Sequence, residues 1–164
     1  SLTVLVMKDV TRDAKPDYDV TTKGTWGLRI DELIDPAAEV AATDPDQVVV
    51  NLGTNNVLQR RDAIASNQDL DRLVDELDGV RCIHLVTVNE QIHHLGGDYT
   101  KEARSLNDEI RRLAAARRNT TVIDWNQMVV DHSGDDIMDA DTVHPNPAGV
   151  ELLAAAYLKA IRSC

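Results

Sequence analysis

The sequence predicts an α/β protein in which helices cover both faces of a mostly parallel β-sheet. Short runs rich in Val, Ile and Thr alternate with longer segments whose apolar residues recur at the helical spacing. Strands that alternate with helices are joined by crossover connections, which favour parallel pairing. We therefore expect residues 1–164 to form one domain with three layers, α/β/α, around this sheet.

In the N-terminal half of the chain, four segments carry this pattern. Residues 18–22 are predicted as a strand, and residues 28–40 as a helix. Residues 47–52, "QVVVNL", form a β-branched run between Asp-Pro-Asp and a glycine, which predicts a buried strand. Residues 70–77 have helical spacing.

The C-terminal half continues the alternation. Residues 82–88, "CIHLVTV", and 120–124, "TTVID", predict two more buried strands, and residues 103–114 and 150–161 place their apolar side chains on one helical face. Residues 89–99 form the longest irregular stretch and are expected to overhang a site. The last helix is predicted to begin with Asn146 as its N-cap and Pro147 at its first position.

Composition excludes some classes of function. The net charge is -11 and the sequence pI is about 4.7, which disfavours binding to a phosphate backbone, so nucleic acid is not an expected partner. The 43% hydrophobic content suits a globular core, and no apolar run approaches the roughly 20 residues of a membrane-spanning helix. No signal-peptide pattern is visible, although a processed chain would have lost one.

The two cysteines, Cys82 and Cys164, are too few for a disulfide scaffold and are not spaced as zinc ligands. Cys82 starts a predicted strand and Cys164 ends the last predicted helix, so both should lie at one edge of the sheet. A disulfide between them, which would suit an extracytoplasmic protein, and two free thiols are equally compatible with this placement.

Ligands of parallel α/β sheets bind at the carboxyl ends of the strands. Residues 53–56, "GTNN", follow one predicted strand directly. The last helix should run antiparallel to the strands, which places its N-terminus, and with it Asp141 and His144, at the same edge. We expect the Asp141 and His144 side chains to lie close to that of Asn55.

Four blocks resemble those of the SGNH (GDSL-type) hydrolase superfamily, in the same order and over essentially the whole chain. They are "SLTV" at 1–4, "YDVTTKG" at 18–24, "VVVNLGTNN" at 48–56 and "DTVH" at 141–144. Within the superfamily, the chain is most similar to the extracytoplasmic SGNH domains of peptidoglycan O-acetyltransferases and other acyltransferase-fused domains. The resemblance implies a flavodoxin-like fold with a mostly parallel sheet of five strands, the first of which would lie upstream of Ser1 or be missing from the chain.

The resemblance also implies roles for individual residues. Ser1 would be the nucleophile, His144 its general base, and Asp141 the carboxylate that orients the imidazole. The Asn55 side chain and the backbone N–H groups of Gly24 and Ser1 would form the oxyanion hole. No cofactor and no metal ion is required by this chemistry.

The function implied is that of a serine esterase or O-acetyltransferase that transfers small acyl groups of a carbohydrate or cell-wall glycan. Such a domain would be extracytoplasmic or associated with the cell envelope, and would be fused to, or work with, a membrane acyltransferase domain. The alternative is a catalytically inactive SGNH-like module that binds glycans or a protein partner.

The position of Ser1 leaves three interpretations. The strand and Gly-Asp pair that precede the family's serine would lie upstream of Ser1, which we favour. Alternatively, residues 3–7, "TVLVM", are that strand, and Lys8-Asp9-Val10 replaces the nucleophile block. Finally, an N-terminal serine could be activated by its own amino group.

A few other side chains are candidates for a site. His93, His94 and Asp98 suggest a metal site, but adjacent histidines point in different directions, and a solvated loop is the preferred interpretation. Trp26 and Trp125 are candidates to line an acyl or sugar site, although packing in the core is the commoner use of tryptophan.

Overall fold

The structure is a computed structural model that describes residues 2–15, 17–132 and 137–164. Within these ranges, no helix is long and apolar enough to cross a membrane. In chain order the elements are α1 (Leu2–Ala14), η1 (Asp31–Leu33), α2 (Ile34–Ala41), β1 (Gln47–Val50), α3 (Thr54–Leu58), α4 (Ala63–Glu76), β2 (Cys82–Val86), α5 (Thr100–Ala116), β3 (Thr120–Ile123), α6 (Trp125–Asp131) and α7 (Pro147–Ser163).

The three strands form one parallel sheet in the order β1-β2-β3. Gln47 of β1 lies opposite Cys82 of β2, and Ile83 of β2 lies opposite Thr120 of β3. The central strand β2 is buried from Ile83 to Val86, as expected for a strand covered on both faces. The predicted parallel α/β class is confirmed.

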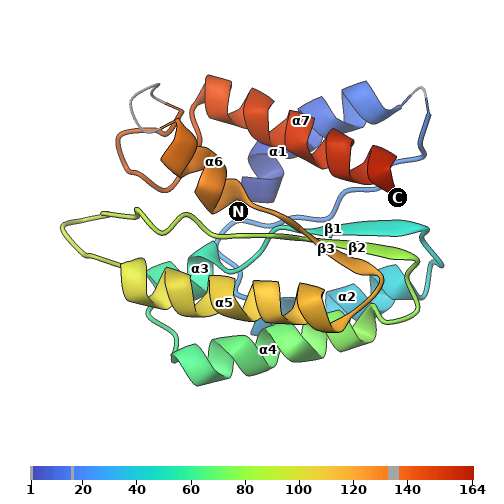
Figure 1. Cartoon of the computed structure of the whole chain (residues 1–164), viewed down its shortest axis with the longest axis horizontal. Helices are drawn as coiled ribbons and strands as arrows, with labels where there is room; N and C mark the ends of the chain where they lie inside the picture. The colour runs from blue at the N-terminus through green and yellow to red at the C-terminus, as the bar shows by residue number, and fades with distance from the viewer. Residues whose placement is uncertain (1, 16, 133–136) are drawn as a thin grey trace.

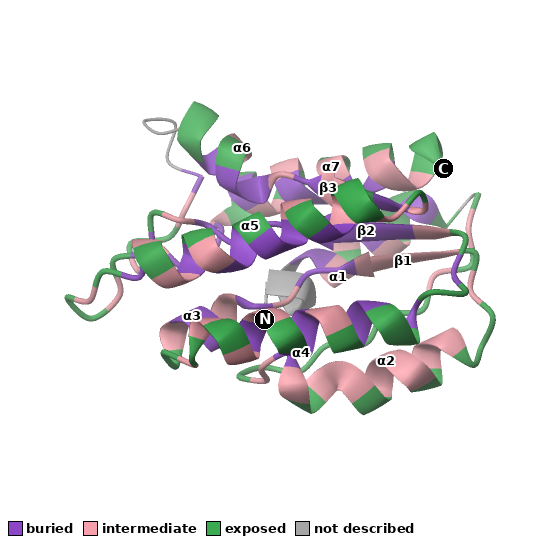
Figure 2. Ribbon diagram, turned by 60° about the horizontal axis from the view of Figure 1, so that its bottom comes forward, coloured by how far each residue is buried: buried purple, intermediate pink, exposed green. Residues whose placement is uncertain are grey.

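Helices cover both faces of the sheet, which gives the three predicted layers (Figure 1). One face carries α2, α4 and α5, and the other carries α1, α6 and α7. Buried residues gather between the sheet and each helical layer, while the outward faces of the helices are exposed (Figure 2). Two core clusters result, one on each face, and both are aliphatic apart from a few aromatic side chains.

The sheet departs from the prediction in strand number. The described residues contain three strands rather than five. Residues 18–22, predicted as a strand, have no regular secondary structure and form no ladder, and most of these residues are exposed. A strand needs a neighbour that accepts and donates its backbone hydrogen bonds, and local β-branched content does not supply one.

The N-terminal segment is helical from Leu2 to Ala14 and packs against α7. The interpretation that residues 3–7 form a strand is therefore wrong. Val6 and Val10, one helical turn apart, are buried in the core on this face of the sheet.

The helix predicted over residues 28–40 begins later than expected. Its first part is the short 3-10 helix η1, and the α-helix α2 starts at Ile34. Pro36 is the third residue of α2, where its missing N–H removes no intrahelical hydrogen bond. This proline therefore marks the first turn of the helix rather than its middle.

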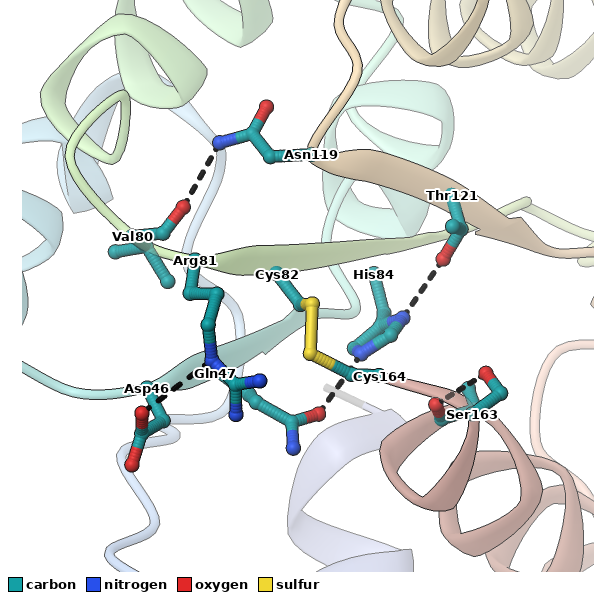
Figure 3. Close-up of a disulfide and its surroundings, with 11 residues drawn as sticks. Asp46, Gln47, Val80, Arg81, Cys82, His84, Asn119, Thr121, Ser163 and Cys164 are labelled. Atoms are coloured by element: carbon teal, nitrogen blue, oxygen red, sulfur yellow. Dashed lines mark hydrogen bonds and ion pairs between the residues drawn. A yellow bond between two sulfur atoms is a disulfide. The ribbon is translucent and has the colours of Figure 1, made fainter.

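A disulfide joins Cys82, at the start of β2, to Cys164, after the last turn of α7, with a Cα–Cα distance of 6.3 Å (Figure 3). Of the two alternatives left open by the sequence, the bonded one is present. Beside it, the buried ring of His84 contacts Thr121 and Gln47 on the two neighbouring strands at 2.7 and 3.2 Å. Burial lowers the pKa of His84, so this imidazole is a neutral structural group at the edge opposite the candidate site.

Candidate functional site

Gly53 ends the segment after β1 and caps the short helix α3. Its φ is +107°, and a Cβ at this position would lie 2.3 Å from Cδ2 of Leu106 and 3.3 Å from Cγ2 of Val88. Only glycine combines this backbone conformation with so close an approach to α5. Gly53 thereby places Asn55 in the first turn of α3, at the carboxyl edge of the sheet.

The Asn55 side chain holds the segment that contains Trp26 against α3. Its Nδ2 donates to the carbonyl oxygen of Leu28 at 2.8 Å, and Gln59 Nε2 donates to the carbonyl oxygen of Gly27 at 3.0 Å. An amide nitrogen carries two N–H groups, and this contact uses one of them. Asn55 therefore retains a donor that suits the predicted oxyanion role.

The neighbouring Asn56 is structural. It is 1% exposed, its Oδ1 accepts from the backbone N–H of Ile30 at 2.9 Å, and its Nδ2 lies 3.2 Å from Ser66 Oγ. These bonds join the segment before η1 to α3 and α4. The two asparagines of "GTNN" thus do different work, because Asn55 is half-buried at the sheet edge and Asn56 is inside the core.

Asp141 and His144 lie within a tight turn that the backbone closes. The N–H of Asp139 donates to the carbonyl oxygen of His144 at 2.8 Å, and Met138 and Pro145 form an antiparallel bridge. Asp141 Oδ1 accepts from the N–H groups of Val143 and His144 at 2.8 and 2.9 Å. The carboxylate is therefore held in place by the backbone of its own turn.

The second carboxylate oxygen meets the imidazole. Asp141 Oδ2 lies 2.7 Å from His144 Nδ1. Burial by itself raises the pKa of the Asp141 carboxyl, but the hydrogen bonds from His144 and Val143 outweigh it and hold that pKa below its ordinary value. An ionised Asp141 fixes the tautomer with the proton on Nδ1, so that Nε2 is the nitrogen able to accept a proton from a nucleophile.

Thr142, which follows Asp141 in the turn, is a β-branched residue at a φ of +58°, which is an unfavourable conformation. Its Oγ1 accepts from the N–H of His93 at 2.7 Å, and its carbonyl oxygen accepts from Asn89 Nδ2 at 3.0 Å. The expected overhanging loop, residues 89–99, therefore lies against the Asp141–His144 turn. Asn89 is 3% exposed, so this contact is part of the folded core.

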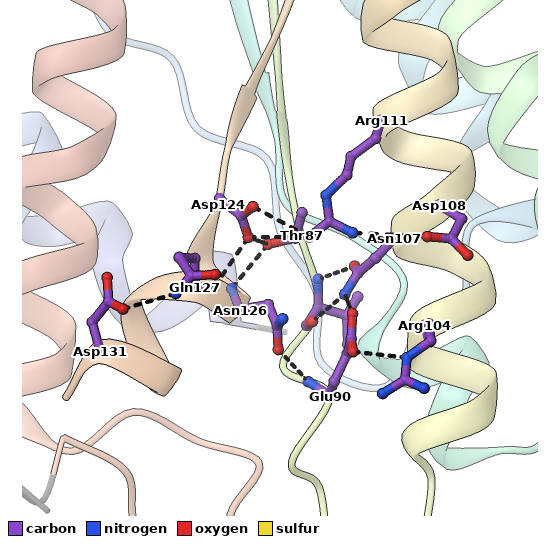
Figure 4. Close-up of polar contacts among 11 residues, drawn as sticks. Thr87, Glu90, Arg104, Asn107, Asp108, Arg111, Asp124, Asn126, Gln127 and Asp131 are labelled. Carbon is purple, nitrogen blue, oxygen red and sulfur yellow. Dashed lines mark hydrogen bonds and ion pairs between the residues drawn. The ribbon is translucent and has the colours of Figure 1, made fainter. Parts of the chain in front are cut away.

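A polar network fixes the start of that loop at the carboxyl ends of β2 and β3 (Figure 4). Thr87 Oγ1 donates to Asp124 at 2.9 Å and accepts from the N–H of Asn126. Asn126 Oδ1 accepts from the N–H of Glu90, and Asn107 Nδ2 donates to Glu90 Oε1 at 3.0 Å. Because Glu90 is adjacent to Asn89, the network also holds the contact with Thr142.

The N-terminus of α7 supports the turn from the other side. Asn146 Oδ1 accepts from the N–H of Gly149 at 3.0 Å and Pro147 is the first helical residue, which confirms the predicted cap. A Cβ on Gly149 would lie 2.1 Å from the carbonyl oxygen of Ile137. Glycine at 149 is what allows the helix to pack directly on the backbone that precedes the turn.

Trp26 is the side chain that approaches His144 from a different part of the chain. The two ring centroids are 6.0 Å apart at an interplanar angle of 62°, and Trp26 is 54% exposed. Trp125 is fully buried and belongs to the core. Since Trp26 is two residues from Leu28, which Asn55 holds, the "GTNN" and "DTVH" blocks flank one surface.

Two other predicted site residues, Ser1 and Gly24, have no described contact with Asn55 or His144. Ser1 lies outside the described residues. Gly24 is exposed in the irregular segment before Trp26, and no described contact joins it to Asn55 or His144. Its role and that of Ser1 stay predictions.

His93 contributes its backbone N–H to the contact with Thr142, as described above. Over residues 2–15, 17–132 and 137–164, no three His, Cys, Asp or Glu side chains are grouped closely enough to hold a metal ion.

Sequence reasoning placed Asn89 in the loop expected to overhang a site but did not single it out, and it gave Thr142 no role of its own. For Asn89 a signal was present, because it is a polar residue immediately after a buried strand. For Thr142 no signal exists in the sequence, since threonine rarely adopts a positive φ.

Comparison with known proteins agrees with the resemblance in the sequence. The model of the GDSL-like Lipase/Acylhydrolase family matches residues 8–152. YrhL of Bacillus subtilis (strain 168), which carries the provisional name peptidoglycan O-acetyltransferase, is 23% identical over 161 residues. That match covers 96% of this chain and 23% of YrhL, so the chain spans less than a quarter of the relative's length.

Two solved structures are similar over most of their length. A lipolytic protein of the G-D-S-L family from Veillonella parvula DSM 2008 matches with a TM-score of 0.81 and 22% identity, covering 96% of this chain and 87% of that one. The C-terminal catalytic domain of Streptococcus pneumoniae peptidoglycan O-acetyltransferase A, with a methylsulfonyl adduct, matches with a TM-score of 0.77 and 21% identity, covering 99% and 89%. At these identities the likeness shows the fold.

Proposed function

Because the chain belongs to the GDSL-like lipase/acylhydrolase family, we propose that it is a serine esterase or O-acetyltransferase acting through an acyl-Ser1 intermediate. The observation that carries this proposal is the pairing of Asp141 Oδ2 with His144 Nδ1 at 2.7 Å. Asp141 Oδ1 accepts two backbone hydrogen bonds at the same time, so the carboxylate is held in the position from which it orients the imidazole.

In the first step, His144 Nε2 takes the proton of the Ser1 hydroxyl while Ser1 Oγ attacks the acyl carbonyl carbon. The carbonyl oxygen becomes an oxyanion, for which the Asn55 side chain and the N–H groups of Gly24 and Ser1 are the proposed donors. Collapse of this intermediate breaks the ester bond. The leaving alcohol takes the proton from His144, and the acyl group stays on Ser1.

In the second step, His144 takes a proton from the acceptor, whose oxygen attacks the acyl-Ser1 carbonyl. Water as the acceptor gives a free acid and an esterase reaction, and a sugar hydroxyl gives a new ester and a transferase reaction. Release of Ser1 Oγ with the proton from His144 restores the starting state.

We propose an acetylated neutral carbohydrate or cell-wall glycan as the substrate. The net charge of -11 disfavours polyanionic substrates, and the names of YrhL and of the pneumococcal domain refer to peptidoglycan. The disulfide supports an extracytoplasmic or cell-envelope location, since such bonds persist in oxidising compartments. The expected partner is a membrane acyltransferase domain that supplies the acyl group.

The test is covalent labelling with a sulfonyl fluoride, followed by intact mass and peptide mapping, together with hydrolysis of an activated acetyl ester. We expect one label on Ser1, no label on Ser1→Ala, and a decrease in kcat of about 10²–10⁴-fold in His144→Ala.

A label on another residue, or full turnover in Ser1→Ala, would contradict the proposal. Absence of both label and turnover in the wild-type protein would favour the glycan- or partner-binding module instead.

A further inference from the structure

The aromatic side chains of this protein are few, and one of them is placed unusually. The chain has two tryptophans, three tyrosines and no phenylalanine. Trp125, Tyr99 and Tyr157 are buried and Tyr18 is half-buried, whereas Trp26 is 54% exposed. An indole that stays in water contributes little to the stability of the fold, so its position calls for a reason other than packing.

The Trp26 side chain stands beside the candidate base. Its ring centroid is 6.0 Å from that of His144 in an edge-to-face arrangement, and more than half of the residue remains uncovered. A molecule whose ester carbonyl lies within reach of His144 Nε2 would therefore extend over the indole.

The backbone around Trp26 is held in place. Gly27 has a φ of +82°, and its carbonyl oxygen accepts from Gln59 Nε2 at 3.0 Å. The next carbonyl oxygen, that of Leu28, accepts from Asn55 Nδ2 at 2.8 Å. The indole is thus presented from a segment tied to the predicted oxyanion donor, which limits the entropy lost when a ligand covers it.

The surroundings of Trp26 decide what it binds. A long acyl chain needs a continuous apolar groove, whereas the residues that flank Trp26 in the sequence, Gly24, Thr25 and Gly27, are exposed and carry no large apolar side chain. One exposed aromatic face without large apolar side chains beside it in the sequence suits a pyranose ring. Such a ring offers C–H groups on its faces and hydroxyls at its rim.

We propose that Trp26 is a specificity-determining residue on which a sugar ring of the substrate stacks while its acetyl ester reaches His144. This inference rests on the proposed function and names the part of the site that would recognise the carbohydrate. In this proposal, the segment before η1 recognises the carbohydrate, and the turn that holds Asp141 and His144 carries out the proton transfer.

The first measurement compares kcat/KM for O-acetylated chitotriose with kcat/KM for ethyl acetate, an ester without a ring, in a pH-stat. Trp26→Ala should lose at least tenfold more on the sugar ester than on ethyl acetate, chiefly through KM, and Trp26→Phe should recover most of that difference. Ile64→Ala is the matched control, since Ile64 is 69% exposed on α4, and it should leave both rates unchanged.

The second measurement is calorimetric binding of unacetylated chitotriose, which does not need turnover. Binding to the wild-type protein that is lost in Trp26→Ala supports the inference. Equal losses on both esters, no loss on either, or binding that is unchanged in Trp26→Ala would overturn it. If neither ester is hydrolysed but chitotriose still binds and Trp26→Ala abolishes that binding, the proposed catalysis is overturned and the role of Trp26 in sugar binding is supported.

Discussion

The disulfide should be a main source of stability in this fold. It joins residues 82 positions apart, so in the unfolded chain it closes a loop of about that length. The chain-entropy relation for a loop of this size corresponds to about 4.5 kcal/mol at 25 °C, as an upper value. Replacing Cys82 and Cys164 by serine should lower the urea midpoint by about 2 M, for a dependence of about 2 kcal/mol per molar. The urea midpoint would be measured by circular dichroism at pH 7.

Reduction supplies the control for this prediction. A phosphine reductant should shift the wild-type midpoint to that of the double serine variant and should leave the variant itself unchanged. A double variant as stable as the oxidised wild-type protein would refute the reasoning. Because the bond lies at the sheet edge opposite His144, folded reduced protein should keep most of any esterase activity.

Three further changes test the backbone and the charge of the site. Gly53→Ala should destabilise the protein by about 3 kcal/mol in urea unfolding, from a strained φ and overpacking of the core. Gly149→Ala should lower Tm in thermal unfolding followed by circular dichroism, because its Cβ would collide with the backbone oxygen of Ile137. Gly79→Ala is the control and should leave Tm nearly unchanged, because a Cβ at Gly79 would have open space around it. Equal Tm values in the two variants would contradict the packing argument. The lowered pKa of Asp141 means that its ionised form stabilises the fold above the carboxyl's ordinary pKa and that this stability is lost as pH falls through the lowered value. The difference in unfolding free energy between wild-type and Asp141→Ala should therefore be constant from pH 7 down to about pH 5 and shrink as the pH is lowered further. A difference that stays constant below pH 5 would contradict this argument.

The main elements could be predicted because their signals are local. The runs that became β1, β2 and β3 are β-branched, and turn residues bound them, so the presence of each strand follows from its own residues. Their burial does not follow in the same way, because β2 is buried from Ile83 to Val86, whereas β1 is buried only at Val50 and β3 has an exposed residue. The cap of α7 was equally local, since Asn146 and Pro147 act on their own helix terminus. Residues 18–22 show the limit of this reasoning, because a strand depends on a partner that its own sequence does not specify.

In the candidate site, too, some contacts are local in the sequence and others depend on the tertiary structure. The pairing of Asp141 with His144 was expected from the resemblance of "DTVH" to a block of the family, and it forms within one turn, so it needs no contact with a distant part of the chain. Only the tertiary structure decided which other groups reach them. Asn89 and Trp26 come from two distant loops, and the contact of each with the turn depends on how β2, α3 and α7 pack at the carboxyl edge of the sheet, which no local pattern encodes.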